Sequence, residues 1–557
     1  MGSIIKKIKH GRPYYYAVKS ARVNGKPRIV WQKYLGTFDQ LIENKQSEKP
    51  IESVISEAGG VLTLLNIANR INLLDVINQQ SIKKKQGPTL GHYILLAVLN
   101  RALDPCSKVQ ISDWYEGTIL PRIWGFDKKA FTSQAFWNHM DLLSEESIKT
   151  IQEQVSQIVL KEFQLDPSVF LYDTTNFYTY IDSSNKRCTI AQRGHNKAKK
   201  HHLRQVSLAL IVTKDWQIPL FHRTYEGNRP DRGLFPDIAR ELHESHKRIV
   251  PSEEKVTYVL DKGNISDNAM EDIIVGGHHF VIAIPSPQVS EIFETNIKMF
   301  EPLQTIAGTK VYCEFVQYCG TKCMCVLTYS ESFFTEQLNG ISNDMVKCQR
   351  ELKEYYDALN KRRDGTGTGK PLTIKDAEKR IRSILAKEFM KDLFTVEIKM
   401  VKKVPQISYS LNREQCDFLL NHRLGRTALI SNHLKWNPEN VIETYRSLSH
   451  IEEAFKRMKN VDYLRWQPSF HWTDQKIQVH GLYCVLALLL ASLARKVACE
   501  SGIELSLWKL LDEVSGIREV ATIYPKGSSK DVLSISRMSP KQKQLAELFE
   551  MHNFLSG

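Results

Sequence analysis

The sequence is poor in the features that mark secreted, fibrous and membrane-spanning chains. Its ten cysteines are scattered over 557 residues, so we expect reduced thiols and no disulfide framework. With 28 glycines and 20 prolines, the chain is neither fibrous nor of low complexity. The longest apolar run, Gly481 to Ala494, has 14 residues. Because a membrane span needs ~20, this run predicts a buried core helix.

Length and charge narrow the class further. A chain of 557 residues exceeds the ~250–300 residues at which one hydrophobic core stops growing, so we expect at least two structural units. Lysine and arginine number 76 against 62 aspartates and glutamates, which gives a formal net charge of +14. At this size the excess favours a polyanionic partner, with nucleic acid first among the candidates.

Residues 1–45 are predicted to form a small basic β unit. Residues 1–38 hold nine lysines and arginines and no acidic residue. Strand-like runs at Tyr14–Val18 and Arg28–Trp31 lie on either side of Asn24-Gly25, which is a strong hairpin signal. Basic side chains beside aromatic ones suit phosphate contact and base stacking, so we expect DNA contact here. A solvated charged hairpin is the alternative.

The next unit, residues 59–165, is predicted to be helical. Its apolar residues recur at spacings of three and four, as in Val61, Leu64, Leu65, Ala68 and Ile71. We expect these helices to pack together as a DNA-binding region.

Short, nearly continuous apolar runs then indicate strands that are buried on both faces. They lie at 169–172, 206–212, 218–225, 256–260 and 280–284, with helical segments near 234–245 and 267–275. This pattern predicts an α/β sheet. We expect it at 166–329 and 398–500, split by a charged, mainly helical insertion at 330–397. A helical tail is expected at 501–557.

Two aspartates are predicted at the ends of strands. Asp173 follows the run 169–172, and Asp261 follows the run 256–260. Ligand groups converge at strand ends in an open α/β sheet. Two carboxylates held close together repel each other unless a cation lies between them, and Mg²⁺ takes oxygen ligands. The pair therefore suggests a metal site, although each aspartate alone could simply cap the turn that follows it.

A third carboxylate lies on a helix that we predict from Asn437-Pro438 to about Asn460. Tyr445, Glu452 and Lys459 are spaced by seven residues, which is two helical turns, so they would form one stripe. Glu452 could reach the two aspartates from the border of the buried face, while Tyr445 and Lys459 could follow a phosphate backbone. A solvated helix face is the alternative.

A basic run follows the first predicted strand of the sheet. Residues 183–214 contain eight lysines and arginines and no acidic residue. We expect this run to follow DNA into the site, with a solvated loop as the alternative. The side chains expected to bind DNA are Arg193, Lys197, Lys199, Lys200 and Arg204.

Asp173, Asp261 and Glu452 together resemble the acidic triad of the DDE transposases. The resemblance extends, in the same order along the chain, to the segments 172–175, 203–206, 226–228 with Asp231, 260–263, 451–459, 466–474 and His480. It covers residues 165–500 and is strongest for the bacterial and archaeal insertion-sequence transposases with a Tyr…Arg…Glu…Lys signature. Leu448 stands where that signature has its arginine.

The resemblance implies an α/β fold with an RNase H-like catalytic core that carries an insertion, preceded by the basic β unit and the helical region. It also implies a Mg²⁺-dependent or Mn²⁺-dependent polynucleotidyl transferase. Such an enzyme cleaves the ends of an insertion sequence and joins them to target DNA in a cut-and-paste reaction. Two metal ions held by Asp173, Asp261 and Glu452 would generate hydroxide and stabilise the leaving 3′ oxygen.

Further side chains receive DNA-binding roles from the same resemblance. Tyr445 and Lys459 would bind the backbone of the transposon end, and Arg446 is the arginine nearest to the altered signature position. Relatives often pass through a hairpin intermediate that requires a flipped base. Trp436 or Trp466 could stack on such a base, or could simply be a packing residue.

The implied partners are double-stranded DNA, as terminal inverted repeats and as target, and a second copy of the chain, since such enzymes bridge two DNA ends as dimers. We expect a cytoplasmic, nucleoid-associated protein of a prokaryote that uses no membrane. Two other functions stay open. One is a catalytically inactive, transposase-derived DNA-binding protein, and the other is a metal-dependent nuclease without strand transfer.

Overall fold

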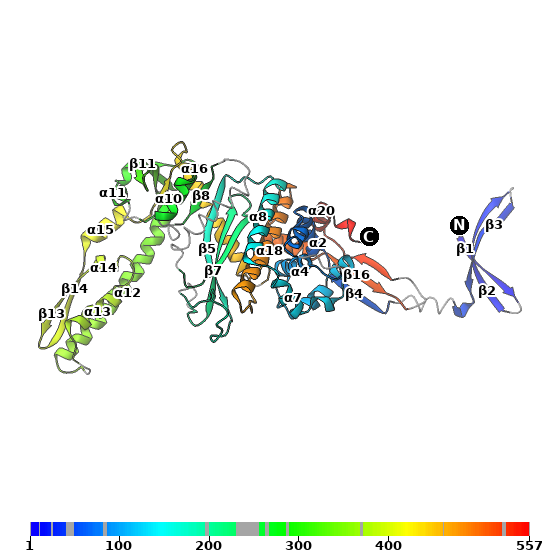
Figure 1. Cartoon of the computed structure of the whole chain (residues 1–557), viewed down its shortest axis with the longest axis horizontal. Coiled ribbons are helices and arrows are strands. Elements are labelled where there is room, and N and C mark those ends of the chain that lie inside the picture. The colour runs from blue at the N-terminus through cyan, green and yellow to red at the C-terminus, as the bar shows by residue number, and fades with distance from the viewer. Residues whose placement is uncertain are drawn as a thin grey trace.

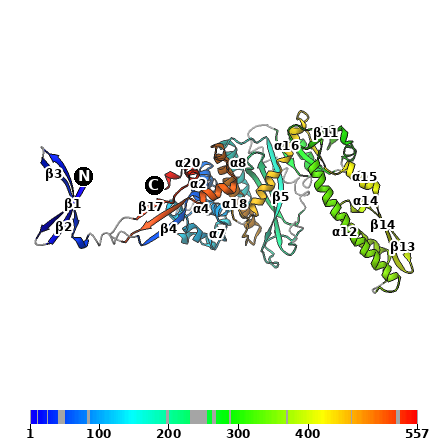
Figure 2. The same ribbon diagram turned by 180° about the vertical axis from the view of Figure 1, so that it is seen from behind.

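The computed structural model describes residues 2–9, 12–23, 26–40, 50–81, 86–194, 200–229, 255–261, 267–285, 289–367, 371–460, 462–525 and 531–555. Figures 1 and 2 show an elongated molecule with a large sheet at its centre. A helical unit lies on one side of this sheet and an insertion extends from the other. The small N-terminal sheet stands apart, beyond the helical unit.

The segment predicted as a basic β unit forms a three-stranded sheet at the N-terminus. It contains the antiparallel strands β1 (Gly2–Lys9), β2 (Arg12–Val23) and β3 (Lys26–Gly36), in that order. Val23 pairs with Lys26 across the predicted hairpin, whose Asn24-Gly25 turn lies outside the described residues. Several large apolar side chains of this sheet are exposed, among them Ile4, Ile8 and Trp31.

The predicted helical region is helical and packs around one central helix. Its elements are α2 (Gly59–Arg70), α3 (Leu73–Asn78), α4 (Leu90–Leu103), α5 (Ile111–Glu116), α6 (Leu120–Trp124), η1 (Lys128–Phe131), α7 (Ser133–Met140) and α8 (Glu145–Glu162). The central helix is α18 (Asp474–Glu500), which contacts α2, α4 and α8. It is long and apolar enough to cross a membrane, but 94% of its most apolar stretch is buried inside the protein. The predicted core helix is thus confirmed.

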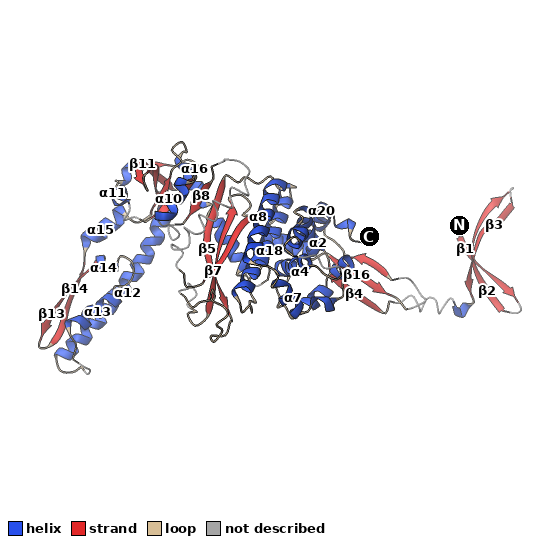
Figure 3. Ribbon diagram, viewed as in Figure 1, coloured by secondary structure: helices blue, strands red, loops and turns tan. Residues whose placement is uncertain are grey.

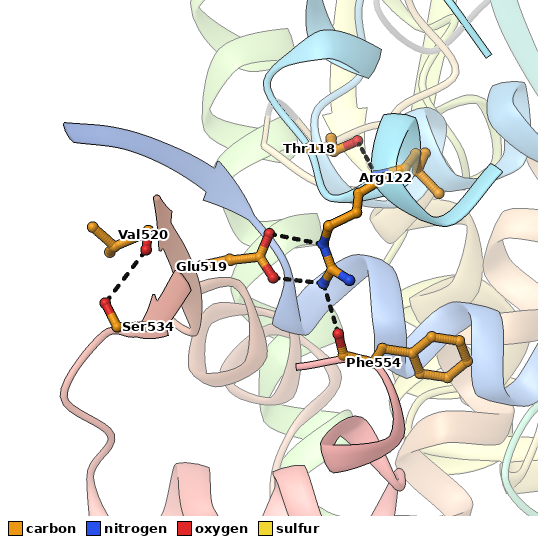
Figure 4. Close-up of polar contacts among 7 residues, drawn as sticks. Thr118, Arg122, Glu519, Val520, Ser534 and Phe554 are labelled. Carbon is orange, nitrogen blue, oxygen red and sulfur yellow. Dashed lines mark hydrogen bonds and ion pairs between the residues drawn. The ribbon is translucent and has the colours of Figure 1, made fainter. Parts of the chain in front are cut away.

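The C-terminal tail is not only helical, which corrects the prediction for 501–557. It holds α19 (Leu507–Ser515), β16 (Arg518–Ile523), β17 (Val532–Ile535), α20 (Pro540–Leu548) and η5 (Met551–Asn553). β16 pairs with β17 and with β4 (Glu52–Glu57), so residues from opposite ends of the chain share one sheet. Figure 4 shows Glu519 of β16 held by Arg122 of α6. The strands were missed because short strands are stabilised by partners that are distant in sequence.

The large sheet contains all five predicted strands. Its order is β10-β11-β12-β15-β9-β8-β5-β6-β7. The strands are β5 (Val169–Thr179), β6 (Arg204–Thr213), β7 (Pro219–Glu226), β8 (Thr257–Leu260), β9 (His279–Ile284), β10 (Glu301–Pro302), β11 (Thr309–Tyr318), β12 (Thr321–Ser330) and β15 (Arg426–Ser431). β5, β8 and β9 run parallel, and the remaining neighbours pair antiparallel.

Helical segments accompany this sheet. The predicted helix at 267–275 is α10 (Asp267–Val275), followed by α11 (Ser290–Phe293) and η4 (Ile297–Met299). The helix predicted near 234–245 lies outside the described residues. α18 lies against β7, so one helix joins the sheet to the helical unit. Figure 3 shows α18 between β7 and α4, whereas α10 and α11 lie toward the insertion.

The insertion extends further than predicted. Between β12 and β15 lie α12 (Glu331–Arg363), α13 (Ile374–Ile384), α14 (Met390–Leu393), β13 (Phe394–Val401), β14 (Val404–Leu411) and α15 (Arg413–His422). These elements have a hydrophobic core of their own. β13 and β14 form a separate two-stranded sheet, so the large sheet resumes at Arg426 and not near residue 398. Alternating apolar residues predict a strand but not the sheet to which it belongs.

Candidate active site

The parallel pairing of β5 and β8 sets two of the predicted acids side by side. Tyr172 pairs with Leu260, and the next residue on each segment is an aspartate, Asp173 and Asp261. Asp261 follows the last residue of β8, as predicted. Asp173 lies inside β5, because the antiparallel partner β6 extends that strand to Thr179. Neighbouring strands lie ~4.8 Å apart, so both carboxylates leave the sheet at the same level.

The helix that carries Glu452 is broken in two, which corrects the prediction of one continuous helix. α16 (Pro438–Arg446) begins as predicted, with the Asn437 side chain accepting a 2.8 Å bond from the Asn440 amide. α17 (Ser449–Met458) follows after a tight turn. The Ser447 hydroxyl donates to the Thr444 carbonyl at 2.5 Å, so it competes with the helical backbone.

Tyr445, at the end of α16, interacts with all three acids. Its phenol donates a 3.0 Å hydrogen bond to Asp261 Oδ1. Burial raises the pKa of Tyr445 well above its usual value, and the charges of Asp261, Asp173 and Glu452 raise it further. Of the three carboxylates, that of Asp261 is in direct contact with this phenol, and the other two act on it through their charge. The structure therefore places Asp173 and Asp261 side by side at Tyr445, and the charge of Glu452, exposed on the first turn of α17, acts on the same phenol.

Carboxylate oxygens are the ligands that Mg²⁺ and Mn²⁺ take, so the chemistry of this cluster fits such ions. In the part of the chain that the structure describes, no three His, Cys, Asp or Glu side chains are placed to hold one ion together. In place of a cation, Asp261 has the Tyr445 phenol as a hydrogen-bond donor. The acid cluster thus fits a cation in its residue types and in its position on the sheet, without being closed around one.

Lys459, the residue after α17, lies next to the same edge of β5. Its ammonium group donates to Thr175 Oγ1 and lies 5.6 Å from the centre of the Phe177 ring. Thr175 is two residues beyond Asp173, and alternate residues of a strand share one face. Tyr445 and Lys459 therefore flank the acids although the helix between them is interrupted. Thr175 belongs to the motif 172–175, but its contact with Lys459 was not predicted from the sequence.

The altered signature position supplies no cation to the acid cluster. Leu448 is half-buried and packs on the main core. Arg446 is exposed and donates to Thr309 Oγ1 of β11 at 3.4 Å. β11 is separated from β8 by three strands of the sheet. The structure thus places the Arg446 guanidinium away from the acids, which does not support the predicted role of Arg446 at the DNA end.

The basic run is partly engaged in holding its own loop. Arg204 donates to the carbonyls of Ser183 at 2.8 Å and Asn185 at 3.1 Å, so it braces the backbone of this loop. Arg193 is exposed and donates to the Ser183 hydroxyl at 3.0 Å, and Lys200 lies 5.2 Å from the centre of the Tyr178 ring. Lys197 and Lys199 lie outside the described residues.

The two tryptophans predicted as base-stacking candidates are both engaged by other side chains. Trp466 is 0% exposed and stacks on Phe177, with ring centres 4.4 Å apart. Trp436 stacks on His433 at 3.7 Å, and His433 bonds to Thr257, the first residue of β8. Trp436 thus lies at the opposite end of β8 from Asp261. The alternative prediction, that both are packing residues, describes this structure.

A cleft of about 950 Å³ connects the acid cluster to the insertion. Its lining includes Asp261 and Tyr445, and also Phe333 of α12, Phe389 and Phe418 of α15. No motif in the sequence signalled this cleft, because its walls come from segments that are far apart in the chain.

Comparisons with known proteins assign no family to the chain. No family model and no curated protein matches the sequence. A piggyBac transposase synaptic complex with hairpin DNA is similar in structure at 9% identity and a TM-score of 0.37, covering 89% of this chain and 85% of that chain. A Mos1 transposase paired-end complex with left transposon end gives 11% identity and a TM-score of 0.14, covering 35% of this chain and 59% of that chain. Similarities this low establish neither a shared fold nor a shared function.

Proposed function

We propose that the protein is a DNA transposase that cleaves insertion-sequence ends and joins them to target DNA by metal-dependent phosphoryl transfer. The observation that carries the proposal is the register of β5 and β8, which sets Asp173 beside Asp261. Glu452 is the third acid, because its charge, like those of both aspartates, raises the pKa of Tyr445. Gathering like charges from three distant segments costs stability, and a bound cation would offset that cost.

The roles of the chain's own residues follow from their positions. Asp173, Asp261 and Glu452 would hold two Mg²⁺ or Mn²⁺ ions, which supply an activated water and stabilise the leaving 3′ oxygen. Tyr445, whose pKa is raised, stays protonated at neutral pH and can donate a hydrogen bond to a phosphate. Lys459 donates to Thr175, which is two residues beyond Asp173 on β5. Its ammonium group would contact a neighbouring phosphate.

The finer assignment follows the resemblance of the sequence motifs. We place the chain with the insertion-sequence transposases that have a Tyr…Arg…Glu…Lys signature and an RNase H-like core. The net charge of +14 supports DNA as partner. We further propose that the active form is a dimer on two DNA ends, in the cytoplasm of a prokaryote at the nucleoid.

The test is nicking of supercoiled plasmid in the presence of Mg²⁺ or Mn²⁺, with chelator as the blank. Asp173→Asn, Asp261→Asn and Glu452→Gln should each lower the rate by at least about 100-fold. Glu453→Gln is the matched control, since Glu453 is adjacent on α17 but pairs with Arg457. Nicking that survives in all three variants would remove the proposal.

Strand transfer separates a transposase from a nuclease. The substrate is an oligonucleotide with a free 3′-hydroxyl whose sequence is taken from inverted repeats beside the reading frame. A transposase joins it to plasmid DNA, whereas a nuclease cuts the plasmid and joins nothing.

A catalytically inactive DNA-binding relative is the second candidate. Two observations favour it. The described residues contain no closed group of three metal ligands, and Leu448 replaces the arginine of the signature. This candidate predicts DNA binding by the wild-type chain with no metal-dependent nicking.

A further inference from the structure

Residues 469–472, in the segment between α17 and α18, alternate between buried and exposed side chains. Ser469 and His471 are 0% and 3% exposed, whereas Phe470 and Trp472 are 59% and 57% exposed. Large apolar side chains are normally the ones removed from water. Here the alternation exposes the rings of Phe470 and Trp472 to solvent. Exposed apolar surface of this kind indicates a binding site.

Buried contacts fix this orientation. The His471 ring lies 3.3 Å from the Tyr483 hydroxyl of α18 and 3.5 Å from the Ser469 hydroxyl. Arg101 of α4 donates to the carbonyls of Arg465 and Gln467 at 3.0 and 2.8 Å. Because the intervening residues are anchored in the core, Phe470 and Trp472 cannot turn inward without breaking this network.

The surface beside the two rings is basic. Asn185 donates a 3.1 Å hydrogen bond to the Trp472 carbonyl, and the next two residues, Lys186 and Arg187, are exposed. The same loop is tied to α18 because the amides of Thr189 and Ile190 donate to Asp474 at 2.7 and 3.0 Å. The backbone of Trp472 is therefore tied to a loop that carries two exposed cations.

This surface lies within a short length of DNA from the acid cluster. Gln467 donates to the Tyr178 carbonyl of β5, five residues beyond Asp173. Five residues of strand span about 17 Å, so Gln467, which precedes the two rings in the segment, lies about five nucleotide rises along the strand from Asp173.

We propose that Phe470 and Trp472 stack on unpaired bases of a DNA strand whose phosphates contact Lys186, Arg187 and Arg193. The inference rests on the proposed function in that the strand leads to Asp173. Aromatic platforms beside a cationic track are the arrangement that binds single strands, since every base has a face for stacking. The cations favour nucleic acid over an apolar protein surface as the occupant.

The experiment measures binding of the full chain to fluorescein-labelled oligothymidylate and to a hairpin duplex by fluorescence anisotropy at one salt concentration. Trp472→Ala and Phe470→Ala should each weaken binding of the single strand about tenfold and change duplex binding less than about twofold. Trp472→Phe keeps a ring and should stay near wild type. Phe315→Ala is the matched control, because Phe315 is 55% exposed on β11 with Lys322 4.7 Å from its ring centre.

Two results would overturn the inference. One is unchanged single-strand affinity in both alanine variants. If light scattering then shows that these variants lose self-association, the surface binds a second copy of the chain and not DNA. The other is an equal loss for single strand and duplex. The nicking assay separates the two proposals: if wild type does not nick but Trp472→Ala still loses single-strand binding selectively, only the proposed catalysis fails.

Discussion

The phenol of Tyr445 and the carboxylate of Asp261 are joined by a 3.0 Å hydrogen bond at the point where β8 ends. Burial, Asp261, Asp173 and Glu452 raise the pKa of Tyr445, so the phenol stays neutral near pH 7. A neutral donor among negative groups stabilises them without adding charge. A cation that takes Asp261 as ligand would compete with this hydrogen bond.

Tyr445→Phe should therefore bind a divalent cation more tightly than wild type. Without metal, loss of the hydrogen bond should lower the free energy of unfolding by about 1 kcal/mol. With Mn²⁺, the increase in Tm should exceed that of wild type, because stabilisation by a ligand grows as its Kd falls. Thermal unfolding with and without Mn²⁺ measures both effects.

Tyr463→Phe is the matched control, since Tyr463 donates to Asp512 at 2.7 Å outside the acid cluster. It should lose stability in the same way and show the wild-type increment with Mn²⁺. Equal increments for Tyr445→Phe and wild type would mean that the phenol and the cation do not compete.

Lys459→Met should weaken binding to DNA of any base sequence by the same factor. The exposed ammonium group bonds to Thr175, two residues from Asp173, and should neutralise one phosphate there. Loss of one such contact lowers the slope of log affinity against log salt by about one. A salt titration of DNA binding measures this slope. Lys543→Met, which changes an exposed lysine of α20, should leave it unchanged; an unaltered slope in both variants would exclude Lys459 from the DNA contact.

The sequence was sufficient to locate five of the nine strands of the large sheet, β5 to β9, and two neighbouring acids, whereas β10, β11, β12 and β15 were not predicted. Runs such as 206–212 are buried on both faces, so their composition alone identifies them. The neighbouring positions of Asp173 and Asp261 were predicted from converging strand ends, although Asp173 lies inside β5, which continues to Thr179. The break at Ser447 did not, because a serine in a helical pattern is also compatible with an unbroken helix.

Features that depend on distant partners could not be predicted. Trp466 and Trp472 belong to one short motif, yet the first is buried against Phe177 and the second is 57% exposed. Composition does not decide which of two tryptophans faces the core. Likewise β13 and β16 have ordinary strand patterns, and only the folded chain shows that each belongs to a small separate sheet.

Glu519→Gln should loosen the C-terminal sheet. Arg122 donates to both carboxylate oxygens of Glu519, at 3.2 and 2.5 Å, and to the Phe554 carbonyl at 2.6 Å (Figure 4). The Glu519 side chain is 8% exposed and that of Arg122 is 38% exposed, so solvent screens the pair in part. We expect a loss of about 1 kcal/mol in the free energy of unfolding, measured by urea denaturation.

Glu116→Gln tests whether any lost ion pair has this effect. Glu116 pairs with Lys128 where both side chains are exposed, at 58% and 40%. Its removal should change the free energy of unfolding by less than the Glu519 variant does. A larger effect at Glu116 than at Glu519 would contradict the importance given to burial.

Lys108→Met should stabilise the protein most at neutral and acidic pH. Lys108 is buried, and its ammonium group has no hydrogen-bond partner in the described structure. Burial, with a further contribution from Arg101, lowers the pKa of Lys108 from 10.5 to about 7. Between these values the unfolded chain binds a proton that the folded chain does not, so wild-type stability should rise with pH across this window. Below about pH 7 Lys108 is protonated in the folded chain too, so the free energy of unfolding is lowered by the whole cost of burying its charge.

The methionine variant removes this dependence. Its free energy of unfolding should exceed that of wild type by a few kcal/mol near pH 6, because each pKa unit corresponds to ~1.4 kcal/mol, and the two should converge toward pH 10. His471 and His480, whose pKa values burial lowers well below 6.5, do not titrate in the window above pH 7. Lys476→Met is the control: that buried lysine pairs with Asp141, so its loss should destabilise the fold. Parallel pH profiles of wild type and Lys108→Met would show that Lys108 keeps its ordinary pKa.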